Sequence, residues 1–238
     1  MKIVMFAVGI ILAFSANSQA ISANYKYVNS SKVQITEQQK QKVEKIIEQT
    51  IKETEDSLSA IAEPITFTIR IVDWDLSPVY GVTGRTDKAD EIEVSISTAY
   101  EKGLDDAIEQ GLRGLIFHEL HHSIRGWTMH DNKFPKGIDV AAINEGLADV
   151  FAEEQISREM NKMPKDVDFE AWIKEIRQLP KDANYGHWMG FHPDGRIAVG
   201  YRAGAYVVRL AMKNSGKDII ELSKLSVEEI YRLANLHD

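Results

Sequence analysis

The chain of 238 residues contains no cysteine. This absence excludes a disulfide-stabilised scaffold, a cysteine nucleophile, a thiolate metal site and a lipid-modified cysteine. Any metal site must therefore use histidine and carboxylate ligands, and the fold must be stabilised by packing. A chain without cysteine is also compatible with an oxidising compartment.

An excess of positive charge is absent as well. Lysine and arginine number 28 against 36 aspartate and glutamate residues, which gives a formal net charge of −8. Such a balance argues against a nucleic-acid-binding surface, which needs a basic stripe. Apolar residues make up 44% of the chain and charged residues 27%, so a single domain of this length can bury a core.

Long hydrophobic runs are lacking beyond the N-terminus. Met1-Lys2 precedes an uncharged, almost wholly apolar run over 3–14, and Ser18-Gln19-Ala20 follows as a small-x-small cleavage pattern. The run has about twelve residues, whereas a membrane-spanning helix needs roughly twenty. We therefore predict a signal peptide over 1–20, cleaved after Ala20, and a secreted or periplasmic protein with no stable membrane insertion. An uncleaved N-terminal anchor is the alternative.

Local patterns predict one helix and a few strands in the first half of the mature chain. The capping-box pattern Thr36-x-x-Gln39 opens the helix, and Glu63-Pro64 stops it. Alternation of apolar and polar residues identifies the strands. The expected elements are a loose polar leader over 25–32, a helix over 36–63, strands over 65–72 and 92–96, and an extended or turn segment over 81–86.

After Gly103 the apolar spacing becomes helical. The expected helices begin near Asp105 and end at Gly126, begin at Asp139 and continue through Phe151, and cover roughly 169–179, 201–213 and 226–236, with a loop over 184–200. Strands early and helices late predict an α+β fold. We expect one domain over 21–238, with a small N-terminal β-sheet, a helix that carries the active site, and a mainly helical C-terminal half.

The pattern H-E-x-x-H occurs once, with His118, Glu119 and His122. Four helical residues advance about 6 Å and turn about 400°, so both imidazoles leave the helix on nearly the same side. Two neutral ring nitrogens can then reach one tetrahedral zinc ion, and Glu119 lies beside the metal, where it can take a proton from water. His121 could also reach a metal, but we prefer it as a supporting or packing residue.

The third ligand decides the class of zinc site. A metzincin would continue with glycine and histidine at positions that Arg125 and Thr128 occupy here, so that class is excluded. Downstream, the next expected helix contains Asn144-Glu145-Gly146-Leu147-Ala148-Asp149.

At these residues the chain resembles the gluzincins, the thermolysin-like zinc peptidases, whose second helix carries N-E-x-x-x-D. It is also similar to a family of predicted zinc-dependent proteases marked by H-E-x-H-H and E-G-L-A. The segment Gly200-Tyr201-x-x-Gly204 fits the G-Y-x-x-G pattern of that family. The resemblance covers roughly 81–208 and implies a zincin-like fold with one zinc ion per chain.

The resemblance implies roles for three further residues. Glu145 would complete the zinc ligands with His118 and His122, and Asp149 would hold the second ring nitrogen of His118. Tyr201 would stabilise the oxyanion that develops during hydrolysis.

Two residues of the glycine-rich segment remain alternatives for that last role, His187 and His192.

These residues together predict a zinc-dependent peptidase, with Glu119 as general base for a metal-activated water and a peptide or protein as substrate. Strand-like residues 81–86 are candidates for holding an extended substrate. Two other functions use the same residues: a zinc hydrolase of a non-peptide amide or ester, and a secreted zinc-binding or regulatory module without catalysis.

Overall fold

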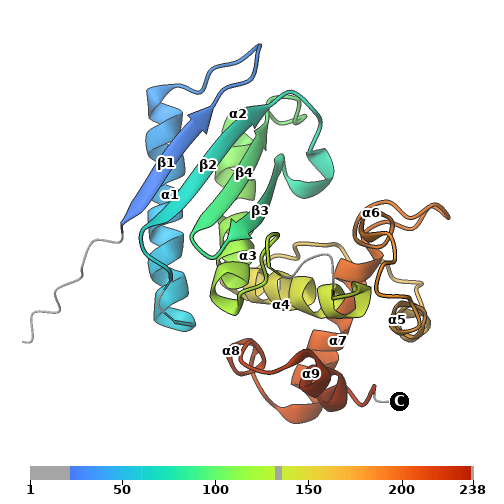
Figure 1. Cartoon of the computed structure of the whole chain (residues 1–238). Helices are drawn as coiled ribbons and strands as arrows, with labels where there is room; N and C mark the ends of the chain where they lie inside the picture. The colour runs from blue at the N-terminus through green and yellow to red at the C-terminus, as the bar shows by residue number, and fades with distance from the viewer. Residues whose placement is uncertain (1–21, 60, 132–135, 237–238) are drawn as a thin grey trace, which may run out of the picture.

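The computed structural model describes residues 22–59, 61–131 and 136–236. The predicted signal peptide, 1–20, lies outside these residues. A small β-sheet in the N-terminal half is followed by a helical C-terminal half, so the α+β prediction is confirmed (Figure 1). Within the described ranges, no helix combines the length and apolar character needed to cross a membrane.

The sheet has four strands in the order β1-β2-β4-β3. β1 (Ala23–Val28), β2 (Ile65–Val72) and β4 (Glu91–Ser97) run parallel, and β3 (Val82–Lys88) is antiparallel to β4. β3 therefore forms an edge of the sheet, next to the helices that follow it in the chain. A turn of 3-10 helix, η1 (Ser77–Val79), precedes β3.

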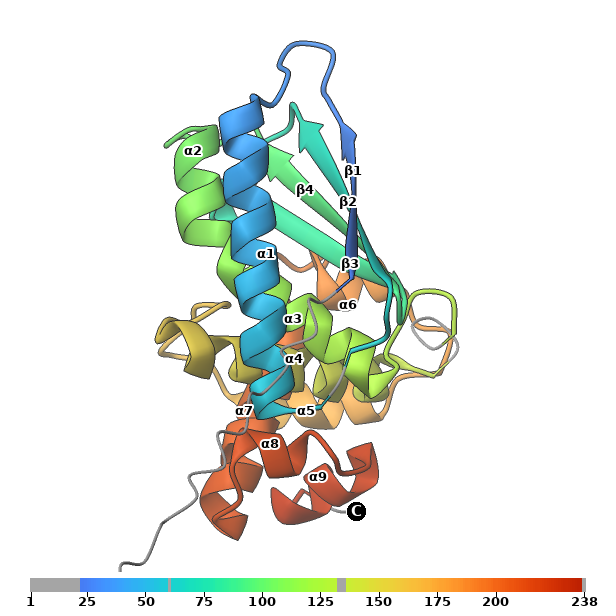
Figure 2. The ribbon, with the colours of Figure 1, turned by 90° about the vertical axis from the view of Figure 1, so that its left-hand side faces the viewer.

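One face of the sheet is covered by α1 (Glu37–Ser57) and by a long helical run that ends in α3 (Figure 2). The alternation predicted for β2 places its isoleucines and Phe67 in this buried layer. Thr36 caps α1 through the expected capping box with Gln39. The helix ends at Ser57 rather than at 63, and Ile61 packs into the core from the connection.

The prediction of a loose leader over 25–32 is wrong, because Ala23–Val28 forms β1. Its Tyr25 ring stacks on Phe67 of β2 with the ring centroids 6.1 Å apart. Every second residue of β1 faces the core, an alternation that the polar composition obscures. The loop expected over 184–200 is also partly wrong, since it contains the short helix α6 (Tyr185–Met189).

The helix expected from 105 to Gly126 is present as one continuous run. It consists of α2 (Leu104–Asp106), a π-helical turn η2 (Ala107–Gly111) and α3 (Leu112–Arg125). Gly126 ends it with a positive φ of 70°, as predicted from glycine's access to the left-handed conformation. α3 lies between the sheet core and the core of the helical half, so polar residues on its middle turns are buried.

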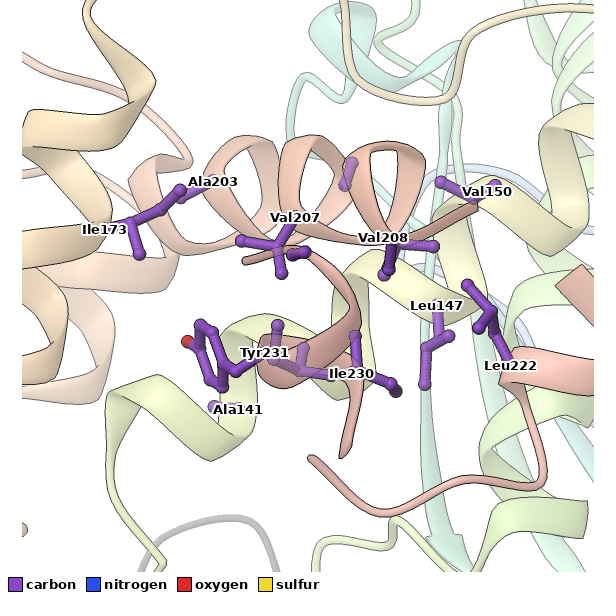
Figure 3. Packing of buried hydrophobic residues seen from close by; sticks show 14 of the residues in the cluster. Ala141, Leu147, Val150, Ile173, Ala203, Val207, Val208, Leu222, Ile230 and Tyr231 are labelled. Carbon is purple, nitrogen blue, oxygen red and sulfur yellow. The ribbon is translucent and has the colours of Figure 1, made fainter. Parts of the chain in front are cut away.

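The helical half is centred on α4 (Ile138–Ile156) and α7 (Val199–Ser215), with α9 (Val227–Leu233) packed beside them (Figure 3). Ala203, Val207 and Val208 of α7 and Leu147 and Val150 of α4 belong to the same apolar cluster. The smaller helices α5 (Phe169–Arg177) and α8 (Ile219–Leu222) complete this layer.

The helices α4 and α7 cross in backbone contact. A Cβ atom placed on Gly204 would lie 1.7 Å from the carbonyl oxygen of Ala142, and one on Gly146 would lie 2.2 Å from the carbonyl carbon of Gly204. Any side chain at either glycine would push the helices apart. Gly146 of E-G-L-A and Gly204, the second glycine of G-Y-x-x-G, thus have a structural reason, which is the close approach of the two helices.

We expect Gly204→Ala to destabilise the protein although alanine has the higher helix propensity. The new methyl group meets rigid backbone, and overpacking of this kind costs about 1–3 kcal/mol, or roughly 2–12 °C in Tm for a domain of this size. Gly114→Ala is the control, because its Cβ would meet only the movable ends of Ile156 and Met160. Equal melting temperatures for the two variants in calorimetry would contradict the close crossing.

Candidate metal centre

The two histidines of H-E-x-x-H lie one turn apart on α3 and face each other. Their Nε2 atoms are 2.9 Å apart. Glu145 of α4 brings its Oε2 atom to 3.2 Å from His118 Nε2 and 3.1 Å from His122 Nε2. The structure therefore brings together the three predicted ligands, all of them buried.

The spacing and chemistry of this triangle fit zinc. Tetrahedral zinc has bonds of about 2.0–2.1 Å to nitrogen and oxygen, which separates neighbouring ligand atoms by about 3.3 Å. The three donor atoms lie 2.9–3.2 Å apart, close to that separation. Two imidazoles and one carboxylate would hold a zinc ion through three ligands, the number that hydrolytic zinc sites use.

The second oxygen of Glu145 is held by two donors. The Trp127 Nε1–H and the Tyr185 hydroxyl each donate to Oε1 at 3.2 Å. Trp127 is placed by the end of α3, where its backbone N–H donates to His122 O at 3.0 Å just after the Gly126 turn. With Oε1 occupied in this way, Oε2 is directed toward the two imidazoles.

Trp127 and Tyr185 were missed by sequence reasoning. Trp127 follows a helix stop, and Tyr185 lies in the segment expected to be a loop. Asn184 caps α6 by accepting from the backbone N–H of His187, which fixes the turn that carries Tyr185. Burial and the nearby Glu145 carboxylate raise the pKa of Tyr185, so its hydroxyl stays protonated and can donate.

Asp149 lies one turn beyond Glu145 and contacts the other side of His118. Its Oδ1 atom is 3.0 Å from His118 Nδ1, and its Oδ2 atom accepts from Asn161 Nδ2 at 2.7 Å. A carboxylate on Nδ1 fixes the ring and leaves Nε2 to face a metal ion.

The electrostatics of the two imidazoles favour a cation between them. Burial acts to lower the pKa of His118, but hydrogen bonds to Asp149 and Glu145 outweigh it and raise that pKa to about 10. Burial lowers the pKa of His122, which favours its neutral form. The carboxylates of this buried site therefore stabilise positive charge at His118, whether a proton or a metal ion supplies it.

Glu119 is not one of the three converging donors, and its carboxylate contacts β3. The Thr86 hydroxyl lies 2.9 Å from both Glu119 Oε2 and the Glu119 backbone oxygen. A Cβ atom on Gly84 would lie 2.9 Å from Glu119 Oε1, so the strand approaches this carboxylate closely only because residue 84 is glycine. The edge strand β3 thus fixes the position of the Glu119 carboxylate, although none of the three candidate metal ligands comes from this strand.

A cleft of about 430 Å³ opens onto this side of the site. Its lining includes His118, Glu119 and Asp149, with Thr83 and Gly84 of β3 and Tyr201 of α7. The candidate base Glu119 and one candidate ligand, His118, therefore border the same open space.

The structure distinguishes the three candidates for oxyanion stabilisation by position. Tyr201 lines the cleft, with its ring centroid 6.3 Å from that of His118. Burial, then the surrounding carboxylates, raise the pKa of Tyr201 well above 10, so the phenol is a proton donor at neutral pH. His187 is exposed, His192 pairs with Asp194 at 2.7 Å, and neither lines the cleft.

His121 is directed away from the ligand triangle. Its Nε2 atom lies 2.9 Å from Ser223 Oγ, and that hydroxyl donates to Ile219 O at 2.7 Å. The imidazole also packs at 5.6 Å from the Phe151 ring, and burial lowers its pKa well below 6.5. His121 is therefore a neutral residue in the packing between α3, α4 and α8.

Comparison with known families also points to a zinc site in this chain. Residues 43–232 match the family described as "Predicted Zn-dependent protease (DUF2268)". The chain belongs to this family of predicted zinc-dependent proteases. The family match covers the ligand triangle, Glu119 and the whole of the α4–α7 crossing. Comparisons with curated proteins and with solved structures find no match.

For this member of the predicted zinc-dependent protease family, we expect His122→Ala to abolish stoichiometric zinc binding, because two donors cannot complete the site.

Asp149→Asn should weaken zinc binding by about 10- to 100-fold, the range for partners that orient a ligand. Elemental analysis after dialysis and titration against a chromophoric chelator measure both. His187→Ala is the exposed control. Zinc retained at one per chain in His122→Ala would contradict the assigned ligands.

Proposed function

We propose that the protein is a zinc-dependent peptidase of the gluzincin type, with His118, His122 and Glu145 as the zinc ligands. The observation that carries the proposal is the convergence of these three buried donors, one of which, His118, lines an open cleft together with Glu119. Membership of the zinc-dependent protease family supports the general activity. The three zinc ligands and the catalytic roles of individual residues are proposals beyond that membership.

A zinc ion bound at this triangle would supply Lewis acidity, which makes a bound water more acidic and polarises the substrate carbonyl. Glu119 accepts the proton of the attacking water and passes it to the leaving amine. Its position supports this role, because Thr86 and Gly84 hold the carboxylate on the cleft side and outside the ligand triangle.

Tyr201 donates a hydrogen bond to the oxyanion. Its place on the cleft wall and its raised pKa support this role over His187 and His192. α7 carries Tyr201 close to His118 because the crossing of α4 and α7 has no side chain between the backbones.

β3 binds the substrate as an added strand. Gly81 O accepts from Ser97 N, so the hydrogen bonds of the β3–β4 pair fall on odd residues, and the backbone groups of Val82 and Gly84 point to the outer edge. Val82 and Gly84 line the cleft, whereas Thr86 O, further along this edge, accepts from Met129 N at 3.0 Å. An extended peptide that pairs with Val82 and Gly84 would lie across Glu119.

Export is part of the proposal and rests on the sequence alone. The pattern of Met1-Lys2, the apolar run over 3–14 and Ser18-Gln19-Ala20 supports cleavage after Ala20 and a secreted or periplasmic enzyme.

Glu119→Gln tests the proposed activity most simply. The amide cannot accept the proton, so we expect kcat to fall by about 10²- to 10⁴-fold while one zinc ion per chain remains bound. A peptide-library digest with and without chelator measures activity, and elemental analysis measures zinc. Full activity in this variant would end the proposed mechanism. Zinc without peptide cleavage in the native protein would favour a binding module, and cleavage of non-peptide amides alone would favour a different hydrolase.

Thr86→Val tests whether the hydroxyl positions Glu119. Valine keeps the shape of threonine but removes the hydrogen bond, and we expect kcat to fall by about 10- to 100-fold with KM and zinc content unchanged. Thr86→Ser should restore most of the activity. A loss shared equally by serine and valine would indicate packing as the cause instead.

A further inference from the structure

The cleft is lined by more cationic than acidic side chains, although the protein as a whole is acidic. Three cationic residues line the cleft, Arg158, Lys162 and Arg202, whereas the whole chain carries a formal net charge of −8. Glu119 and Asp149 are the acidic residues of the lining. Both carboxylates have hydrogen-bonding partners inside the site, Thr86 for Glu119 and Asn161 and His118 for Asp149.

The two cleft arginines lack carboxylate partners within 4 Å in the described part of the chain. Arg158 donates to Gln110 O at 2.7 Å and lies 3.8 Å over the Tyr80 ring, and Arg202 donates to Ile197 O at 2.8 Å. The Nε atom of each is buried and makes no hydrogen bond to a described residue. Other arginines of the chain do pair with carboxylates: Arg70, Arg85, Arg113, Arg196, Arg209 and Arg232.

These contacts fix the two guanidinium groups and leave most of their donors open. A guanidinium has five N–H donors, and each of the two arginines uses one for a backbone carbonyl. A partly buried cation without an anion is unfavourable, and burial lowers the pKa of Arg202 for that reason. A ligand carboxylate would supply both the missing charge and paired acceptors in the fork geometry that arginine prefers.

Each arginine is accompanied by exposed apolar surface. Val79, next to Tyr80 in the chain, lines the cleft, as do Ile197, whose backbone oxygen Arg202 contacts, and Phe191, which is 75% exposed and pairs with Ile197. The cleft therefore offers cationic donors within an apolar surround, which matches a peptide with both apolar and acidic groups. The net negative charge of the chain repels acidic peptides elsewhere on the surface, so recognition of such a ligand depends on this local patch.

We propose that Arg158 and Arg202 select peptide substrates that present a carboxylate near the scissile bond. This inference rests on the proposed peptidase function and adds the substrate class. The carboxylate can come from an aspartate or glutamate side chain or from a free C-terminus, and both offer the same group to a guanidinium.

Matched fluorogenic peptides separate the two sources. One series exchanges glutamate for glutamine at each position around the scissile bond, and a second compares free with amidated C-termini. We expect kcat/KM to be about 10- to 100-fold higher for the carboxylate member of at least one pair, the range of a charge-assisted hydrogen bond. A preference confined to the first series identifies a side chain, and one confined to the second identifies the C-terminus. Equal rates in both series would overturn the inference and leave the peptidase function intact.

Variants assign the preference to the arginines. Arg202→Gln and Arg158→Gln should each reduce it by raising KM for the carboxylate peptide alone, and Arg202→Glu should favour lysine-bearing peptides. Arg158→Lys keeps the charge over Tyr80 and controls for the fold at that position. Arg232→Gln, on α9 and paired with Glu229, should leave the preference unchanged. An undiminished preference in Arg158→Gln/Arg202→Gln would also overturn the inference.

Binding provides a measurement that does not need turnover. Fluorescence anisotropy on zinc-loaded Glu119→Gln should give a Kd about 10-fold or more lower for the glutamate or free-acid peptide than for its amide. If the native protein cleaves no peptide, the proposed function fails, and this binding comparison still decides the inference. Equal affinities here would contradict carboxylate recognition itself.

Discussion

The buried carboxylate of Glu145 is the group on which the rest of the site depends. It is fully inaccessible to solvent, on a helix whose residues are mostly buried. A buried carboxylate strongly destabilises a fold unless hydrogen bonds and positive charge compensate for its lost hydration. Trp127 and Tyr185 supply the hydrogen bonds on one oxygen, and the other oxygen faces two imidazoles in the geometry of a metal site. A divalent cation is the charge that this arrangement suits.

Two close contacts of α4 fix the position of Glu145 relative to the rest of the site. On one side α3 lies against it, so that the histidines of one helix meet the glutamate of the next. On the other side Gly146 and Gly204 let α7 approach to backbone distance, which brings Tyr201 and Arg202 to the same cleft. The edge strand β3 contacts α3 instead, where the Thr86 hydroxyl holds the Glu119 carboxylate. Sheet, α3, α4 and α7 thus each contribute one part of the candidate site.

Helical geometry makes part of this site predictable from sequence. The spacing of His118 and His122 requires only that 105–125 be helical, and Gly126 marks where that helix stops. Glu145 and Asp149 follow from a family pattern rather than from local physics, because no spacing rule joins residues of different helices. The α+β class follows from the order of alternating and helical patterns.

Contacts between distant segments account for what sequence reasoning missed. Trp127 and Tyr185 reach Glu145 from a helix stop and from a short helix, neither of which carries a sequence signal for this contact. β1 was mistaken for a loose leader because its core-facing residues include two tyrosines among polar neighbours, and only pairing with β2 shows their common face. That Arg158 and Arg202 have no carboxylate partner among the described residues is likewise visible only in three dimensions, because the sequence does not show which arginines form ion pairs.

The most direct test of the account is a zinc-edge anomalous diffraction experiment on crystals of the zinc-loaded protein. The account predicts one strong anomalous peak per chain, bonded at about 2.0–2.1 Å to His118 Nε2, His122 Nε2 and a Glu145 oxygen, with a solvent-facing fourth position. A peak bonded to His121 in place of His122, or one that leaves Glu145 outside coordinating distance, would contradict it.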